Sequence, residues 1–163
     1  MTRVAQVAWL ALTFMAIGEV HRAECEDAPS APPLFLQASI STAGPYGESW
    51  YLTLAPSGEV SLQVFYSKSP SGSLLARFSL SEEQALTIRK ACESQTFFAL
   101  PSDLTPPQRA FHRPHLQLDI HLAGRHHKVS LYDPAALKGQ AATSRFLAVW
   151  NSVFEQLPLR PSW

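Results

Sequence analysis

Apolar and polar residues alternate through much of the chain after residue 33, which is the pattern of strands that bury one face of a sheet. A Pro-Ser-Gly-Glu turn at residues 56–59 separates two such runs and predicts a hairpin. A second hairpin is predicted within residues 114–133, after an irregular loop over 101–114. The pattern therefore predicts five or six strands, among them those over residues 34–41, 50–55, 60–66 and 74–80.

Two other segments carry apolar residues at helical spacing. Ser81 and Gln84 have the spacing of a capping box, so we expect a helix from there to about residue 95. A second helix is predicted through SRFLAVWNSVFEQL, residues 144–157, and Pro158 ends it. The fold class predicted from these elements is α+β, an antiparallel sheet of five or six strands with two amphipathic helices packed on one face.

The N-terminal segment has the composition of a targeting sequence. One basic residue precedes an apolar run over residues 4–17, which is long enough for a signal peptide and too short to span a bilayer. We expect a signal peptide over residues 1–23, cleaved after Gly18 or Ala23, and then a Pro-rich tether over 24–33. The mature protein is then exported, to the periplasm or the extracellular space, and has no integral membrane segment. One α+β domain over 34–158 and a short tail over 159–163 complete the organisation.

The charge composition limits the classes of molecule that we expect this chain to bind. Thirteen acidic and thirteen basic residues leave no net charge, which argues against a nucleic-acid or anionic-membrane partner. The two cysteines, Cys25 and Cys92, allow two interpretations in an exported chain. They form a disulfide that pins the tether to the first helix, or Cys92 packs on that helix as a small buried hydrophobe. The sequence leaves these alternatives and the oligomeric state open.

Four of the six histidines fall within PHLQLDIHLAGRHHKVSLYD, residues 114–133. With a turn at Gly124-Arg125, the predicted register places His121 opposite Lys128 and leaves His127 at the edge of the apolar face. Asp119, His121 and His126 then share the polar face and form a candidate zinc site. Because Lys128 would repel a cation beside His121, a solvated sheet face is the favoured interpretation and a metal site the alternative.

Other catalytic patterns are missing from the sequence. It contains no Gly-x-Ser-x-Gly elbow and no glycine-rich phosphate loop, and burial of Cys92 would raise its pKa and make it a poor nucleophile. A non-enzymatic protein without a cofactor is therefore favoured over an enzyme. Aromatic residues beside Gly/Ser/Pro loops are candidates for a binding surface, although those at strand ends, such as Trp50, would equally complete the core. The candidate binding residues are Tyr46, Trp50, Tyr51 and Tyr66.

The order of elements over residues 40–157 resembles that of emfourin-type domains, small bacterial inhibitors of thermolysin-like metallopeptidases. The resemblance rests on the loop Ala43-Gly44-Pro45-Tyr46-Gly47, on FSLSEEQALTI and FFALP, on the LDIHLAGRHHKV hairpin and on the closing helix. It implies an inhibitory role in which the loop over residues 44–50 meets a protease.

Two functional hypotheses follow from the sequence. The first is an exported, non-enzymatic binding domain, with a protein among its candidate partners and peptidase inhibition as its sharper form. The second is a metal-binding protein or metal-dependent enzyme that uses the histidine hairpin over residues 115–127.

Overall fold

The computed structural model describes residues 32–42, 47–66 and 69–158. The signal peptide, most of the tether, Cys25, Tyr46 and the C-terminal tail therefore lie outside the described residues. The elements follow in the order β1 (Leu34–Ser41), β2 (Glu48–Leu54), β3 (Glu59–Tyr66), β4 (Ser69–Ser79), α1 (Glu82–Ser94), a short 3-10 helix (Phe97–Ala99), β5 (Asp103–Leu104), β6 (His115–Leu122), β7 (Arg125–Tyr132) and α2 (Ala141–Phe154).

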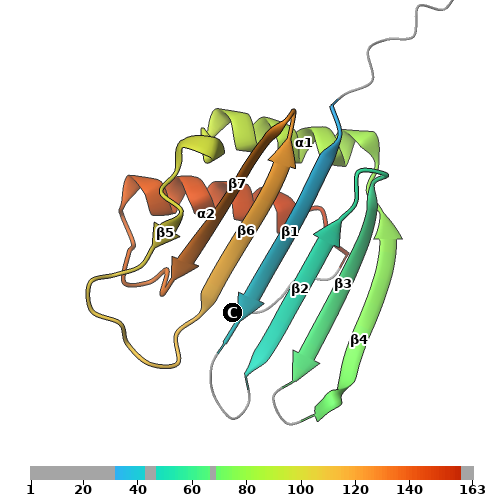
Figure 1. Cartoon of the computed structure of the whole chain (residues 1–163). Helices are drawn as coiled ribbons and strands as arrows, with labels where there is room; N and C mark the ends of the chain where they lie inside the picture. The colour runs from blue at the N-terminus through green and yellow to red at the C-terminus, as the bar shows by residue number, and fades with distance from the viewer. Residues whose placement is uncertain (1–31, 43–46, 67–68, 159–163) are drawn as a thin grey trace, which may run out of the picture. The chain divides into compact units, whose positions relative to one another are not determined.

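The strands form one seven-stranded sheet in the order β4-β3-β2-β1-β6-β7-β5, and α1 and α2 lie together on one side of it (Figure 1). All neighbours are antiparallel except β5, which pairs in parallel with β7. The predicted α+β class with an antiparallel sheet and two helices is confirmed, but the predicted number of strands is wrong. The missed strand is β5, whose two residues are too few for an alternating pattern and which forms only by pairing with Ser130 and Leu131.

β1 lies at the centre of the sheet because it pairs with β2 on one side and with β6 on the other. Its pairing with β6 is long-range and aligns Leu34 with Leu122 and Ile40 with Leu116. The alternate residues of these strands that face the helices are fully buried against Phe146 and Trp150 of α2. Burial of each such large apolar side chain contributes about 1.5–3 kcal/mol, so this shared core holds the sheet and the helices together.

Both helices form close to where they were predicted. At the start of α1, the Ser81 hydroxyl accepts a hydrogen bond from the backbone N–H of Gln84 at 3.2 Å, and the Gln84 side chain accepts one from the Ser81 N–H at 2.8 Å. The capping box is therefore confirmed. Helix α2 begins three residues earlier than predicted, at Ala141, because the preceding turn closes with a hydrogen bond from the Gln140 N–H to the carbonyl of Leu137.

The predicted register of the β6–β7 hairpin is wrong by two residues. Ala123 and Gly124, with φ of 51° and 75°, occupy the two central turn positions, as a type I′ turn requires. His121 therefore pairs with His126, and Lys128 pairs with Asp119 instead of His121. A shift of two residues keeps every side chain on its own face of the sheet, so the apolar pattern alone could not detect the error.

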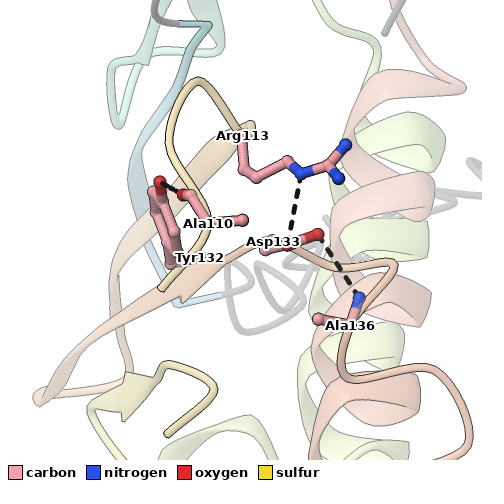
Figure 2. A network of polar contacts seen from close by, with 5 residues as sticks. All are labelled: Ala110, Arg113, Tyr132, Asp133 and Ala136. Carbon is pink, nitrogen blue, oxygen red and sulfur yellow. Dashed lines mark hydrogen bonds and ion pairs between the residues drawn. The ribbon is translucent and has the colours of Figure 1, made fainter. Parts of the chain in front are cut away.

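β7 leads into α2 through a turn built on Asp133, which is buried and has a φ of 49°. One of its carboxylate oxygens accepts a hydrogen bond from the Ala136 N–H at 3.3 Å, and the other lies 3.6 Å from Nε of Arg113 (Figure 2). Beside it, the Tyr132 hydroxyl donates to the carbonyl of Ala110. These contacts tie the loop before β6 to the end of β7. None of the helices in the described residues is long and apolar enough to cross a membrane.

Candidate metal centre

The face of the sheet opposite α1 and α2 is covered by no other described element (Figure 1). Alternation along the strands points polar and aromatic side chains outward on this open face, while their neighbours enter the core. The open face carries Phe35, Gln37 and Ser39 from β1, Tyr51 and Thr53 from β2, His115, Gln117, Asp119 and His121 from β6, and His126, Lys128 and Ser130 from β7.

Three of these side chains converge next to the β6–β7 turn. Nε2 of His126 lies 2.8 Å from Oδ1 of Asp119, and Nε2 of His121 lies 3.5 Å from the same oxygen. The two imidazole rings stack with 3.9 Å between their centroids and 15° between their planes. Each residue thus offers one ligand atom, and the three atoms lie within 4.8 Å of one another. The structure brings together the three residues that the sequence placed in its candidate metal site.

The spacing of these atoms is close to what a bound metal ion needs. Zinc binds imidazole nitrogen and carboxylate oxygen at about 2.0–2.1 Å, which in a tetrahedral site separates neighbouring ligand atoms by about 3.3 Å. The His121–Asp119 distance of 3.5 Å already matches this separation, and the His126–Asp119 distance of 2.8 Å is a hydrogen bond that metal binding would replace. Binding by both imidazoles would also require the two rings to rotate out of their parallel stack, because a metal ion lies near the plane of each imidazole that binds it.

Residues of β1 and of the segment before it contact the cluster from one side. The ring of Phe35 packs edge-on against His121, with 5.3 Å between centroids and 72° between planes. Phe35 and the two histidines also line a shallow hollow with Pro33 and Pro56. A second hollow, of about 240 Å³, lies farther along the open face and includes Asp119 and Lys128 in its lining. Asp119 is the better shielded ligand, with 20% of its side chain exposed, against 48% and 54% for the two histidines.

The remaining histidines of the hairpin do not reach the cluster. His127 faces the helices, as expected, where its Nε2 lies 2.8 Å from the carbonyl oxygen of Leu100 and its ring packs edge-on against Phe97. His115 lies at the other end of β6, next to Tyr132. Burial lowers the pKa of His115, and the charges of Arg109 and Lys128 add to this effect while Asp103 opposes it.

The three described residues among the predicted aromatic binding residues, Trp50, Tyr51 and Tyr66, do not form one cluster. Tyr46 lies outside the described residues, and Trp50 points to the core side of β2 and packs against the core. Tyr51 and Tyr66 are exposed, at 48% and 46%, and Tyr51 meets the ring of Phe65 edge-on at 5.5 Å on the open face. Of the three candidates that the structure describes, Tyr51 alone shares the open face with the candidate metal centre and lines one of its hollows.

Two features of the site were missed in the sequence. Phe35 and Gln37 reach the site only because β1 pairs with β6, a long-range pairing that no local pattern indicates. Their outward direction was nevertheless visible in the alternation of residues 34–41. Cys92 is buried, and burial raises the pKa of its thiol to about 12, in the direction expected from the sequence.

No protein-family model matches the chain, and a search among curated proteins found no similar sequence. The resemblance to emfourin-type domains therefore stays a prediction.

Proposed function

We propose that this chain is a non-enzymatic binding protein whose ligand is a divalent transition metal ion, held by Asp119, His121 and His126. The observation that supports the proposal is the convergence of the three ligand atoms within 4.8 Å of one another. Imidazole nitrogens combined with one carboxylate oxygen suit zinc, copper and nickel better than magnesium or calcium, which prefer oxygen ligands. Zinc is therefore the first ion to test.

The backbone favours this site because a cross-strand pair supplies two of its ligands. His121 and His126 flank the turn as direct partners, and Asp119 lies two residues before His121 on the same face. Paired strands hold these three Cα positions fixed, so little backbone ordering remains to oppose binding. Because His126 and Asp119 now share a hydrogen bond, metal binding at Nε2 must displace the proton between them, which a neutral imidazole then carries on Nδ1.

Binding fits the surroundings better than catalysis does. A metal-dependent hydrolase needs a general base next to the metal-bound water, as well as walls that exclude solvent. The other described side chains that line the two hollows at the cluster include Phe35, Gln117, Arg125 and Lys128, and none of these lining side chains is a carboxylate or an imidazole. Both histidines are about half exposed, which suits a site that exchanges its ion with solvent.

The test is a zinc titration of residues 24–163 by calorimetry, together with elemental analysis. We expect one zinc per chain in the parent protein and at least a tenfold loss of affinity in His121→Ala and in His126→Ala. His112→Asn is the matched control, because His112 is exposed, lies outside the cluster and has a φ of 59° that asparagine tolerates. Equal zinc binding by the parent and by the double variant H121A/H126A would refute the proposal.

The proposed location of the protein is exported, in the periplasm or the extracellular space, which rests on the signal-peptide pattern of residues 1–23. Expression of the full chain followed by fractionation and N-terminal sequencing tests it. A mature N-terminus at Glu19 or Glu24 would support export, whereas an intact N-terminus in the cytoplasmic fraction would contradict it.

A further inference from the structure

We infer that the metal bound by Asp119, His121 and His126 completes its coordination with a small carboxylate ligand, which lies in the neighbouring hollow with its second oxygen at Lys128. This inference rests on the proposed function, because the carboxylate has no anchor without the metal. The inference identifies a carboxylate as the ligand on the open side of the metal. It also gives a role to Lys128, which is not a ligand of the metal.

The position of the hollow is the first argument. It has a volume of about 240 Å³ and lies over β1, β2, β6 and β7. Asp119 belongs both to this hollow and to the metal cluster, so a ligand in the hollow reaches the metal directly. The volume is below the roughly 300–1,000 Å³ of sites for drug-sized ligands, which indicates a small molecule or the end of a chain.

Charge is the second argument. A divalent ion with one carboxylate and two neutral imidazoles keeps one positive charge, and Lys128 adds another where it pairs with Asp119 in the register. Within the part of the chain that the structure describes, Lys128 takes part in no ion pair, since the three close pairs involve Arg113, His121 and His126. An anion next to the metal would therefore offset two positive charges at once.

The chemistry of the lining selects a carboxylate among anions. Phosphate sites gather several cations or a helix N-terminus, whereas this hollow offers one ammonium, from Lys128. The other polar groups are the amides of Gln37 and Gln117 and the hydroxyls of Ser39 and Thr53, which suit one further carboxylate oxygen. Tyr51 closes the far side of the lining and offers an aromatic surface to the apolar part of the ligand.

Such a carboxylate has two possible sources, a free organic acid or the C-terminus of a peptide. Hippurate imitates a peptide terminus and carries a ring for Tyr51, and acetate represents the smallest free acid. The protein loaded with Co²⁺ reports ligand entry directly, because the visible absorption of bound cobalt changes with its coordination. Tighter binding of hippurate than of acetate would assign the site to larger or peptide-derived carboxylates, and equal binding would assign it to small acids.

The experiment is a titration of the Co²⁺-loaded chain with each carboxylate, for the parent, Lys128→Gln and Lys138→Gln. We expect a saturable change of the cobalt spectrum, and a three- to fivefold weaker carboxylate affinity in Lys128→Gln, about the size of an exposed ion pair. Lys138→Gln is the matched control, because Lys138 is exposed and lies in the connection to α2. We expect this variant to behave like the parent.

The possible failures separate the two proposals. A parent chain that binds no cobalt and no zinc would overturn both. Cobalt binding with a spectrum that carboxylate leaves unchanged would overturn the carboxylate ligand and leave the metal site standing. An unaltered carboxylate affinity in Lys128→Gln, with the cobalt spectrum still responding in both proteins, would overturn the role of Lys128 and the placement of the ligand in this hollow.

Discussion

His121 and His126 are direct partners in the β6–β7 hairpin, and their rings stack 3.9 Å apart on the open face of the sheet. This relationship depends on the turn between them, in which Ala123 and Gly124 both have a positive φ. With the turn displaced to Gly124 and Arg125, His121 would face Lys128 and the two histidines would not be partners. The turn residues therefore determine that the two histidines are direct partners.

The turn makes a first prediction. Ala123 is exposed and has a φ of 51°, which is unfavourable for alanine and readily adopted by asparagine. Ala123→Asn creates the Asn-Gly pair preferred in type I′ turns, and we expect it to stabilise the protein by roughly 0.5–1 kcal/mol. Urea denaturation followed by circular dichroism measures the change in the free energy of unfolding.

Ala135→Asn, at another exposed alanine without a positive φ, is the control and should change stability by less than about 0.5 kcal/mol. A loss of stability in Ala123→Asn would argue for the displaced register, because Ala123 would then be a strand residue and asparagine is unfavourable in strands. The same variant should keep its zinc affinity, since the partners of the metal ligands do not change.

The error in the register shows what could be predicted from the sequence here and what could not. Strand positions follow from local alternation, and the α1 cap follows from the spacing of Ser81 and Gln84, so both were predicted well. The prediction that Asp119, His121 and His126 share one face of the sheet is also correct, because a shift of two residues leaves each side chain on the same face. Choosing between the registers required knowing that Ala123 adopts a positive φ, which its residue type does not indicate.

Long-range pairing of strands accounts for the other features of the structure that were not predicted from the sequence. β5 exists only because Asp103 and Leu104 meet β7, and Phe35 reaches His121 only because β1 lies beside β6. No local pattern encodes which strands become neighbours in a sheet. The three ligands of the candidate centre come from one hairpin and were therefore accessible from the sequence, whereas their supporting residues from β1 were not.

Phe35 gives a second prediction, which rests on the proposed metal site. Its ring holds one side of the His121 imidazole, and aromatic pairs of this kind contribute about 0.5–1.5 kcal/mol. In Phe35→Leu we expect zinc affinity to fall by about two- to tenfold, because His121 loses the contact that orients it. Phe111→Leu is the control, since Phe111 is 90% exposed. An unchanged affinity in Phe35→Leu would show that the His126 stack alone orients the ring.

Asp133 gives a third prediction, about stability. Asp133→Ala removes one of the two acceptors of the Ala136 N–H, which also donates to the Asp133 carbonyl, and it removes the partner of Arg113 and places alanine at a φ of 49°. We expect this change to destabilise the protein by roughly 2–3 kcal/mol in urea denaturation. Asp133→Asn keeps an acceptor and tolerates the same φ, so it should cost only roughly 0–1 kcal/mol, the value of an ion pair with a half-exposed arginine. Equal losses in the two variants would assign the whole effect to the ion pair.

Cys92 gives a prediction about thiol reactivity. The side chain is fully buried on α1, and burial raises the pKa of its thiol to about 12. In a Cys25→Ser variant we expect no reaction of Cys92 with Ellman's reagent in the native state, and one reactive thiol per chain in urea. Denaturation of the parent chain without reductant tests the disulfide alternative, because a chain without any reactive thiol would show that Cys25 and Cys92 are bridged.

The same thiol makes the stability of the fold depend on alkaline pH. The pKa of the Cys92 thiol is about 12 in the folded chain and 9.0 when the thiol is exposed, so above about pH 9 unfolding allows the thiol to ionise. The contribution of the buried, protonated thiol to the free energy of unfolding is therefore complete below about pH 9. That contribution should fall by about 1.4 kcal/mol for each pH unit between these two values. Cys92→Ala removes this dependence, although it is less stable at neutral pH because of the missing sulfur atom. Measuring the free energy of unfolding of both Cys25→Ser and Cys25→Ser/Cys92→Ala across this range isolates the thiol from lysine and tyrosine titration. Parallel pH profiles would show that Cys92 reaches solvent in the folded protein.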